Sequence, residues 1–135
     1  MRRFLIFVSS LAFFSGPAFA QTVKQGNVSG TLLSASGSAP MGGTDGAILT
    51  TPASGAFVLT QICTTGEPGS NNGDNAQVVG STVGVIAQSY GADLGSCTVY
   101  TPGLAIPPGE ELRCVQGGAS TGAVRCTVTG VLSKK

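Results

Sequence analysis

Short runs of alternating apolar and polar residues follow one another along the chain after residue 20, separated by clusters rich in glycine, proline, serine and asparagine. Alternation with a period of two predicts a β-strand with one buried face, and the clusters between the runs predict turns. No segment after residue 20 shows a sustained helical period. The pattern predicts seven or eight strands, over residues 27–34, 47–51, 56–65, 77–87, 97–101, 104–106, 110–115 and 123–132.

Two of these runs predict which side chains face the interior. In the run 123–132, strict alternation places one set inward and the other toward solvent. In the run 56–65, both faces are partly apolar, which is typical of a central strand in a sandwich. The expected inward set of the first run is Val124, Cys126, Val128 and Leu132, opposite Arg125, Thr127 and Thr129; the two faces of the second are Phe57, Leu59 and Cys63 against Val58, Thr60 and Ile62.

Many short strands with frequent turns predict an all-β fold, an antiparallel β-sandwich of the jelly-roll or immunoglobulin-like kind. Abundant valine and threonine support this, because β-branched side chains fit a pleated surface. The immunoglobulin signature is absent, since the chain has no tryptophan between its cysteines. We expect residues 21–25 to be frayed, and residues 36–46, 66–75 and 90–96 to be loops.

The first twenty residues have a different composition. Arg2 and Arg3 precede an apolar run over residues 4–14, and Ala18-Phe19-Ala20 has the small-x-small form of a cleavage site. This arrangement predicts a signal peptide over residues 1–20 and a single domain over residues 21–135. The run is too short to span a membrane, so the processed chain is expected to be secreted or periplasmic, and the signal is of bacterial type.

Export permits disulfide bonds, and the chain has four cysteines. Three pairings are possible, of which Cys63–Cys97 and Cys114–Cys126 are favoured. The second pair follows from a hairpin with its turn in residues 117–122, which would place Cys114 opposite Cys126 in one sheet. A zinc site is disfavoured, because the chain has no histidine and no C-x-x-C pair.

Charge is sparse. Without Arg2 and Arg3 the seven basic residues become five, against six acidic ones, so the net charge after residue 20 is −1. No basic stripe is present, which argues against a nucleic-acid partner. A surface with so little charge offers little repulsion between copies of the chain.

The chain has few groups for catalysis. It has no histidine to activate a nucleophile, and apart from Lys24 its lysines lie at the C-terminus. Glu110 and Glu111 are adjacent in an expected strand, so they face opposite sides and cannot flank one bond. Residues 67–75 hold only two carboxylates, fewer than calcium usually takes. We therefore predict a non-enzymatic protein with no catalytic residue, cofactor or metal.

Three functions remain open. The first is an extracellular structural or surface-associated protein that self-associates through strand edges, which the low charge favours. The second is a module that binds a glycan or a cell-surface protein through its loops. The third is an inhibitor or effector presenting residues 101–109 as a rigid loop. The candidate ligand residues of the second hypothesis are Asn71, Asn72, Asp74, Asn75, Tyr90 and Tyr100; for both tyrosines, structural packing is the favoured role.

Overall fold

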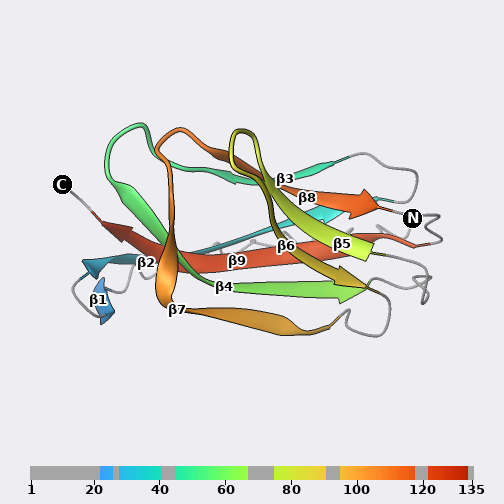
Figure 1. Ribbon diagram of the computed structural model, residues 1–135, viewed down its shortest axis with the longest axis horizontal. Helices are drawn as coiled ribbons and strands as arrows, with labels where there is room; N and C mark the ends of the chain where they lie inside the picture. The colour runs from blue at the N-terminus through green and yellow to red at the C-terminus, as the bar shows by residue number, and fades with distance from the viewer. Residues whose placement is uncertain are drawn as a thin grey trace, which may run out of the picture.

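The computed structural model describes residues 22–25, 28–40, 45–66, 75–90, 95–117 and 122–133. The predicted signal peptide over residues 1–20 lies outside them. The described residues form strands and turns and contain no helix. The strands are β1 (Thr22–Gln25), β2 (Val28–Ala39), β3 (Gly46–Thr50), β4 (Ala56–Gly66), β5 (Asn75–Gly80), β6 (Gly84–Tyr90), β7 (Cys97–Ile106), β8 (Glu111–Gly117) and β9 (Val124–Ser133) (Figure 1).

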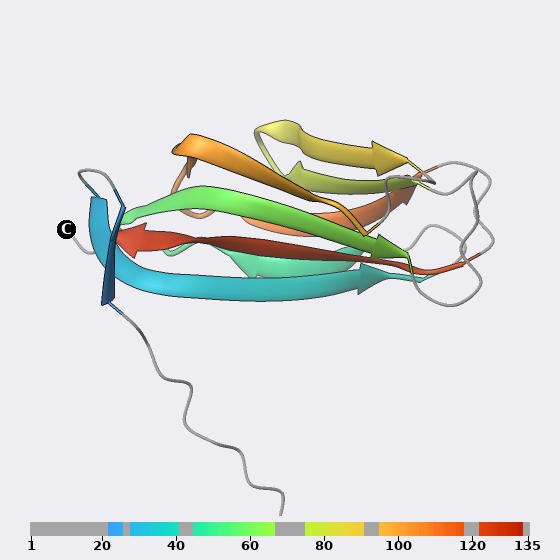
Figure 2. The same ribbon diagram turned by 90° about the horizontal axis from the view of Figure 1, so that it is seen from below.

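These strands form two antiparallel sheets that pack face to face (Figure 2). The five-stranded sheet has the order β1-β2-β9-β4-β7, and the four-stranded sheet has the order β3-β8-β5-β6. The predicted all-β antiparallel sandwich is confirmed. Apart from the short β1, the described strands number eight, the upper end of the expected range.

The pairing of the strands is nested. β5 pairs with β6, β4 with β7, β3 with β8 and β2 with β9, so the chain folds as one long hairpin whose tip lies between β5 and β6. Further pairs, β4 with β9 and β5 with β8, join the rolled hairpin into two sheets. This arrangement is a jelly roll, so the structure selects the first of the two expected sandwich types.

The core between the sheets is almost entirely aliphatic, and Phe57 is its one aromatic side chain among the fully buried described residues. Alternate positions of the central strands supply it, because successive strand residues face opposite sides. The buried set is Ala39, Ile48, Phe57, Leu59, Ile62, Ala76, Val78, Ile106, Leu112, Cys114, Val124, Cys126 and Val128, with Leu33, Ala35, Leu49, Ile86, Ala87, Tyr100 and Leu132 packed against it. The predicted inward face of β9 is therefore confirmed.

The predicted faces of β4 are wrong beyond Leu59. A β-bulge between Leu59 and Gln61 inserts Thr60, so that the inward positions become Thr60, Ile62 and Thr64. Cys63 consequently faces outward. Strict alternation could not reveal this, because an extra residue in one strand shifts the phase of all later residues.

Both favoured disulfides are present, and no cysteine among the described residues is free. The hairpin that suggested Cys114–Cys126 is wrong, however. β8 and β9 do not pair; they lie in different sheets, and the bridge crosses the core between them with a Cα–Cα distance of 5.5 Å. Cys63–Cys97 joins directly opposed residues of β4 and β7 within one sheet.

Several predicted strand limits also change. Residues 22–25, expected to be frayed, pair with β2, and β2 itself continues to Ala39. The expected strand 77–87 is a hairpin of β5 and β6 around the turn 81–83. The expected strands 97–101 and 104–106 belong to one strand, β7, in which residues 97–99 and 104–106 pair with β4 and residues 100–103 have no register partner.

Gly130 is a point of close approach between β9 and β4 in the core. It lies on the inward face of β9, opposite Leu33 and Leu59. A Cβ at this position would lie 2.5 Å from the carbonyl oxygen of Val58 and 2.6 Å from Cζ of Phe57. The ring of Phe57 therefore fills the space that any side chain at residue 130 would need.

We predict that Gly130→Ala destabilises the protein by about 2–3 kcal/mol, because the added methyl group must displace the Phe57 ring or the β4 backbone. Urea denaturation monitored by far-ultraviolet circular dichroism measures the change. Thr129→Ala, one residue earlier on the outer face, is the control and should cost less than about 1 kcal/mol. Equal effects of the two substitutions would contradict the close packing.

Candidate functional site

The register of the strands brings the flanks of the expected loops to one end of the sandwich. Ala39 and Gly66 both lie opposite Val124, and Asn75 lies opposite both Tyr90 and Gly117. The connections that follow β2, β4, β6 and β8 therefore leave from the same end. Asn71, Asn72 and Asp74 of the candidate ligand loop lie outside the described residues.

Asn75 and Tyr100 have structural partners. Asn75 Oδ1 accepts a hydrogen bond from the Gly117 N–H at 2.8 Å, which ties the start of β5 to the end of β8. The Tyr100 hydroxyl donates to the carbonyl oxygen of Ile86 at 3.2 Å, and the half-buried ring packs against the core. Partial burial raises the Tyr100 pKa. These contacts agree with the packing role favoured for Tyr100, which stays a prediction; the side chain of Tyr90 lies outside the described residues.

Glu110 is a buried carboxylate that the sequence analysis missed. It lies just before β8 and is only 2% exposed. Its Oε1 accepts hydrogen bonds from the N–H groups of Thr82, at 2.6 Å, and Val83, at 3.2 Å, while its Oε2 accepts from the Thr82 hydroxyl. The carboxylate thus binds the turn between β5 and β6.

The backbone of Glu110 is held on its other side. Its N–H donates to the Thr51 hydroxyl oxygen at 2.8 Å, and its carbonyl accepts from the Thr51 N–H at 2.8 Å. The Thr51 hydroxyl in turn donates to the Pro107 carbonyl at 2.7 Å. Glu110 therefore connects the end of β3, the turn after β7 and the turn before β6.

Hydrogen bonds to the ionised carboxylate lower the Glu110 pKa. The Thr82 hydroxyl contributes most, followed by the Thr82 N–H, and the Val83 N–H and the Ser81 hydroxyl contribute less. Burial acts in the opposite direction but does not prevail. A carboxylate that is fully occupied by donors and has a lowered pKa is a poor proton donor or acceptor near neutral pH, so its role here is structural.

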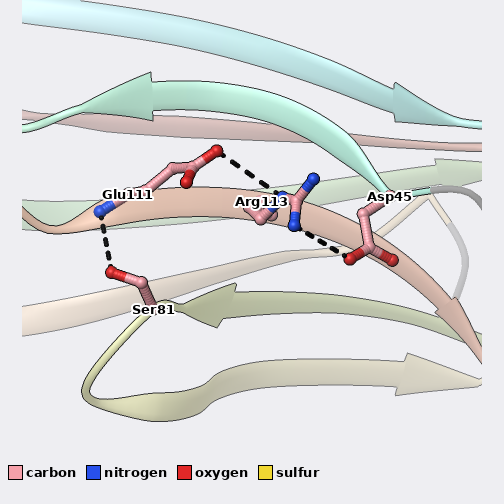
Figure 3. A network of polar contacts seen from close by, with 4 residues as sticks. All are labelled: Asp45, Ser81, Glu111 and Arg113. Carbon is pink, nitrogen blue, oxygen red and sulfur yellow. Dashed lines mark hydrogen bonds and ion pairs between the residues drawn. The ribbon is translucent and has the colours of Figure 1, made fainter.

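The outer face of the four-stranded sheet carries a chain of charges over β8 and the residue before β3 (Figure 3). Arg113 Nη1 lies 3.3 Å from Asp45 Oδ2, and Arg113 Nε lies 3.6 Å from Glu111 Oε1. The Glu111 N–H donates to the Ser81 hydroxyl oxygen at 3.2 Å. These side chains are partly exposed, so the ion pairs contribute little to stability, but they place charge beside the β3 edge.

The outer face of the five-stranded sheet carries hydroxyl groups, one charged side chain and the exposed apolar side chains of Leu32 and Val99. Along β2 and β9, register partners there are Ser34 with Thr129 and Ser36 with Thr127, and the Ser34 and Thr129 hydroxyl oxygens lie 3.2 Å apart. Arg125, hydrogen-bonded to Ser38 Oγ at 3.3 Å, is the one charged side chain on this face of β2, β9, β4 and β7. Hydroxyl groups, rather than charges, hydrate this surface.

The four-stranded sheet has two edges, β3 beside the ion pairs and β6 on the other side, and the β6 strand has no charged residue. β6 ends the four-stranded sheet and pairs only with β5 among the described strands. Its residues, Gly84–Tyr90, include no charged side chain and no proline. Val83 and Val85 lie beside this edge and are 44% and 58% exposed. This edge is the main candidate interaction surface of the described residues.

The known proteins provide no guide to its role. No protein-family model matches the chain, and neither a curated protein nor a solved structure is similar to it. Within the described residues, no three His, Cys, Asp or Glu side chains group as metal ligands. The same residues include no helix long and apolar enough to cross a membrane. A functional proposal must therefore rest on the geometry above.

We predict that Glu110→Gln destabilises the protein at pH 7, because an amide cannot accept all the hydrogen bonds that the turn donates. The folded-state pKa is lowered, so the stabilisation is present above the unfolded pKa and is lost as the pH falls through the folded one. The difference between wild type and variant should therefore shrink below about pH 4. Urea denaturation of both proteins at several values between about pH 2 and pH 7, a range that includes the titration of carboxyl groups, measures this difference in stability.

Glu111→Gln, at the exposed neighbour, is the matched control and should change stability little. A Glu110→Gln variant as stable as wild type at pH 7 would contradict the role of the carboxylate in holding the turn.

Proposed function

We propose that this chain is a secreted, non-enzymatic β-sandwich protein that associates with copies of itself through the edge of β6. The observation that carries the proposal is the combination of an edge strand, paired with another strand on one side only and without charge or proline, and two exposed valines beside it. Strand edges pair readily with another strand, because backbone N–H and C=O groups on their outer side have no strand partner. On β6, the Ile86 carbonyl is occupied, since it accepts a hydrogen bond from the Tyr100 hydroxyl.

The other edges of the two sheets are less suited to pairing. β3 lies beside the Asp45–Arg113 ion pair. β7 contains Pro102, which has no N–H to donate. A bulge interrupts its pairing with β4, and one also interrupts the pairing of β6 with β5, so this feature does not distinguish the two edges. β1 has only four residues, one of which is Lys24. Among the described strands, β6 thus has the least protection against association.

A second copy is the partner that this edge fits best. Two β6 strands related by a two-fold axis would pair antiparallel and join two four-stranded sheets into one continuous sheet. Val85 points outward from the sheet, opposite Val79 of β5, so the two copies would bring apolar side chains together on the same face. The small net charge of the chain gives little electrostatic opposition.

A secreted or periplasmic location agrees with the two disulfides, because such bonds persist in oxidising compartments. The predicted signal peptide supports the same location. Self-association of an exported protein with no evident catalytic group favours a structural or surface-associated role over an enzymatic one.

We predict that Val85→Lys shifts the protein from dimer to monomer, because an introduced lysine on a strand edge opposes pairing. Sedimentation velocity over a range of protein concentrations measures the change. Val99→Lys is the matched control: residue 99 is 65% exposed on β7, and its substitution should leave the association unchanged. Far-ultraviolet circular dichroism should confirm that both variants remain folded.

At a protein concentration of about 1 mM, even weak association is detectable. A wild-type protein that stays monomeric at that concentration would contradict the proposal. So would a Val99→Lys variant that dissociates while Val85→Lys does not.

Ligand binding at the loop end is a second candidate function. The observation that favours it is the convergence of the strand ends that flank residues 40–45, 67–74 and 91–96. Their asparagine, aspartate and serine content suits hydrogen bonding to a neutral glycan or a protein surface. A glycan array with wild type and an Asn71→Ala/Asn72→Ala/Asp74→Ala variant tests it: binding lost in the variant supports the site, and no binding by wild type, with or without calcium, argues against it.

A further inference from the structure

The two disulfides have opposite surroundings. Cys114 and Cys126 are completely buried and join the two sheets through the core. Cys63 and Cys97 instead face outward from the five-stranded sheet, with Cys63 half-buried and Cys97 exposed. The β-bulge at Thr60 causes this difference, because it turns Cys63 away from the core. Accessibility to a reagent in solution is therefore confined to one of the two bridges.

The exposed bridge lies at the start of an edge strand. Cys97 is the first residue of β7, and it is directly opposite Cys63 of β4. Only the pairs Ile62–Thr98 and Gln61–Val99 separate the bridge from the bulge, after which pairing resumes at Leu59–Leu104. On the other side of the bridge there are two hydrogen bonds: the Thr64 N–H donates to the Ser96 carbonyl at 3.0 Å, and the Gly95 N–H donates to the Thr64 carbonyl at 2.5 Å. The first part of β7 is thus held by the disulfide and few hydrogen bonds.

We infer that Cys63–Cys97 is a site of thiol–disulfide exchange, which an external dithiol opens while the rest of the jelly roll stays folded. A thiolate of the dithiol attacks the exposed Cys97 sulfur, and the S–S bond breaks with its electron pair on Cys63, which takes a proton from water. The second thiol of the reagent then attacks the mixed disulfide and releases the Cys97 thiol. Two cysteine thiols and one oxidised reagent result, with two electrons transferred.

Opening the bridge has a defined structural consequence. Residues 97–99 lose their covalent anchor, while residues 104–106 remain paired with β4 through the buried Ile106 and its partner Phe57. Residues 61–63 of β4 then lose their partners in β7 and form an additional strand edge, near the end of the sandwich at which β4 ends. The site therefore couples a redox change to the exposure of a new pairing surface, and it does so independently of β6.

Cysteine mapping of the oxidised protein tests the exchange. The folded protein is treated with dithiothreitol for increasing times and alkylated with iodoacetamide, and the labelled cysteines are identified by peptide mass spectrometry. Cys63 and Cys97 should become labelled at least about tenfold faster than Cys114 and Cys126, with an unchanged far-ultraviolet spectrum. Equal rates for all four cysteines, faster labelling of Cys114 and Cys126, or no labelling without denaturant would overturn the inference.

A Cys63→Ser/Cys97→Ser variant is the matched control, and it should show no rapidly labelled cysteine. Hydrogen exchange tests the release of β7: after reduction, amides in residues 97–99 and 61–63 should exchange faster, whereas those in residues 104–106 should not change. Uniform acceleration along β7 would contradict local opening. The Val85→Lys variant should be labelled at the wild-type rate, because the exchange does not depend on association through β6. The exchange and the self-association can therefore be tested, and can fail, separately.

Discussion

The contact between the Glu110 carboxylate and the turn at residues 81–83 determines where the four-stranded sheet ends. Three hydrogen bonds from Thr82 and Val83 stabilise the turn that separates β5 from β6. Because this turn is the tip of the long hairpin, its position sets which strands pair throughout the nested arrangement. The contact also places β6 at the edge of its sheet, and the proposed function depends on that position.

The two lateral sides of the four-stranded sheet differ in charge. Beside β3, the Asp45–Arg113–Glu111 ion pairs protect the edge against other strands. Beside β6, valines are exposed and charges are absent from the strand. In the proposed function this asymmetry confines association to one side, which would form a closed pair rather than a continuous filament.

Local patterning is sufficient for the fold class and the core face of β9, because both depend on residue type and alternation along the chain. The two cysteine pairs are predicted correctly, but the hairpin argument for the second is wrong, because Cys114 and Cys126 lie in different sheets. The errors arose where distant residues decide the outcome. The turn that divides residues 77–87 is stabilised by Glu110, which lies 28 residues beyond Thr82 in the sequence. The phase of β4 changes at a bulge, which alternation of residue types cannot show. The sequence places Glu110 beside Glu111 in an expected strand and does not indicate its burial, because a buried carboxylate is identified by its donors and not by its neighbours in sequence.

Hydrogen exchange of the wild-type protein at low and high protein concentration is the most direct test of the β6 interface. If copies pair through this edge, amide protection should increase with concentration within Gly84–Tyr90 and remain constant within β1, β3 and β7. Protection of β6 that does not depend on concentration, or a concentration-dependent increase at another edge instead, would contradict the account.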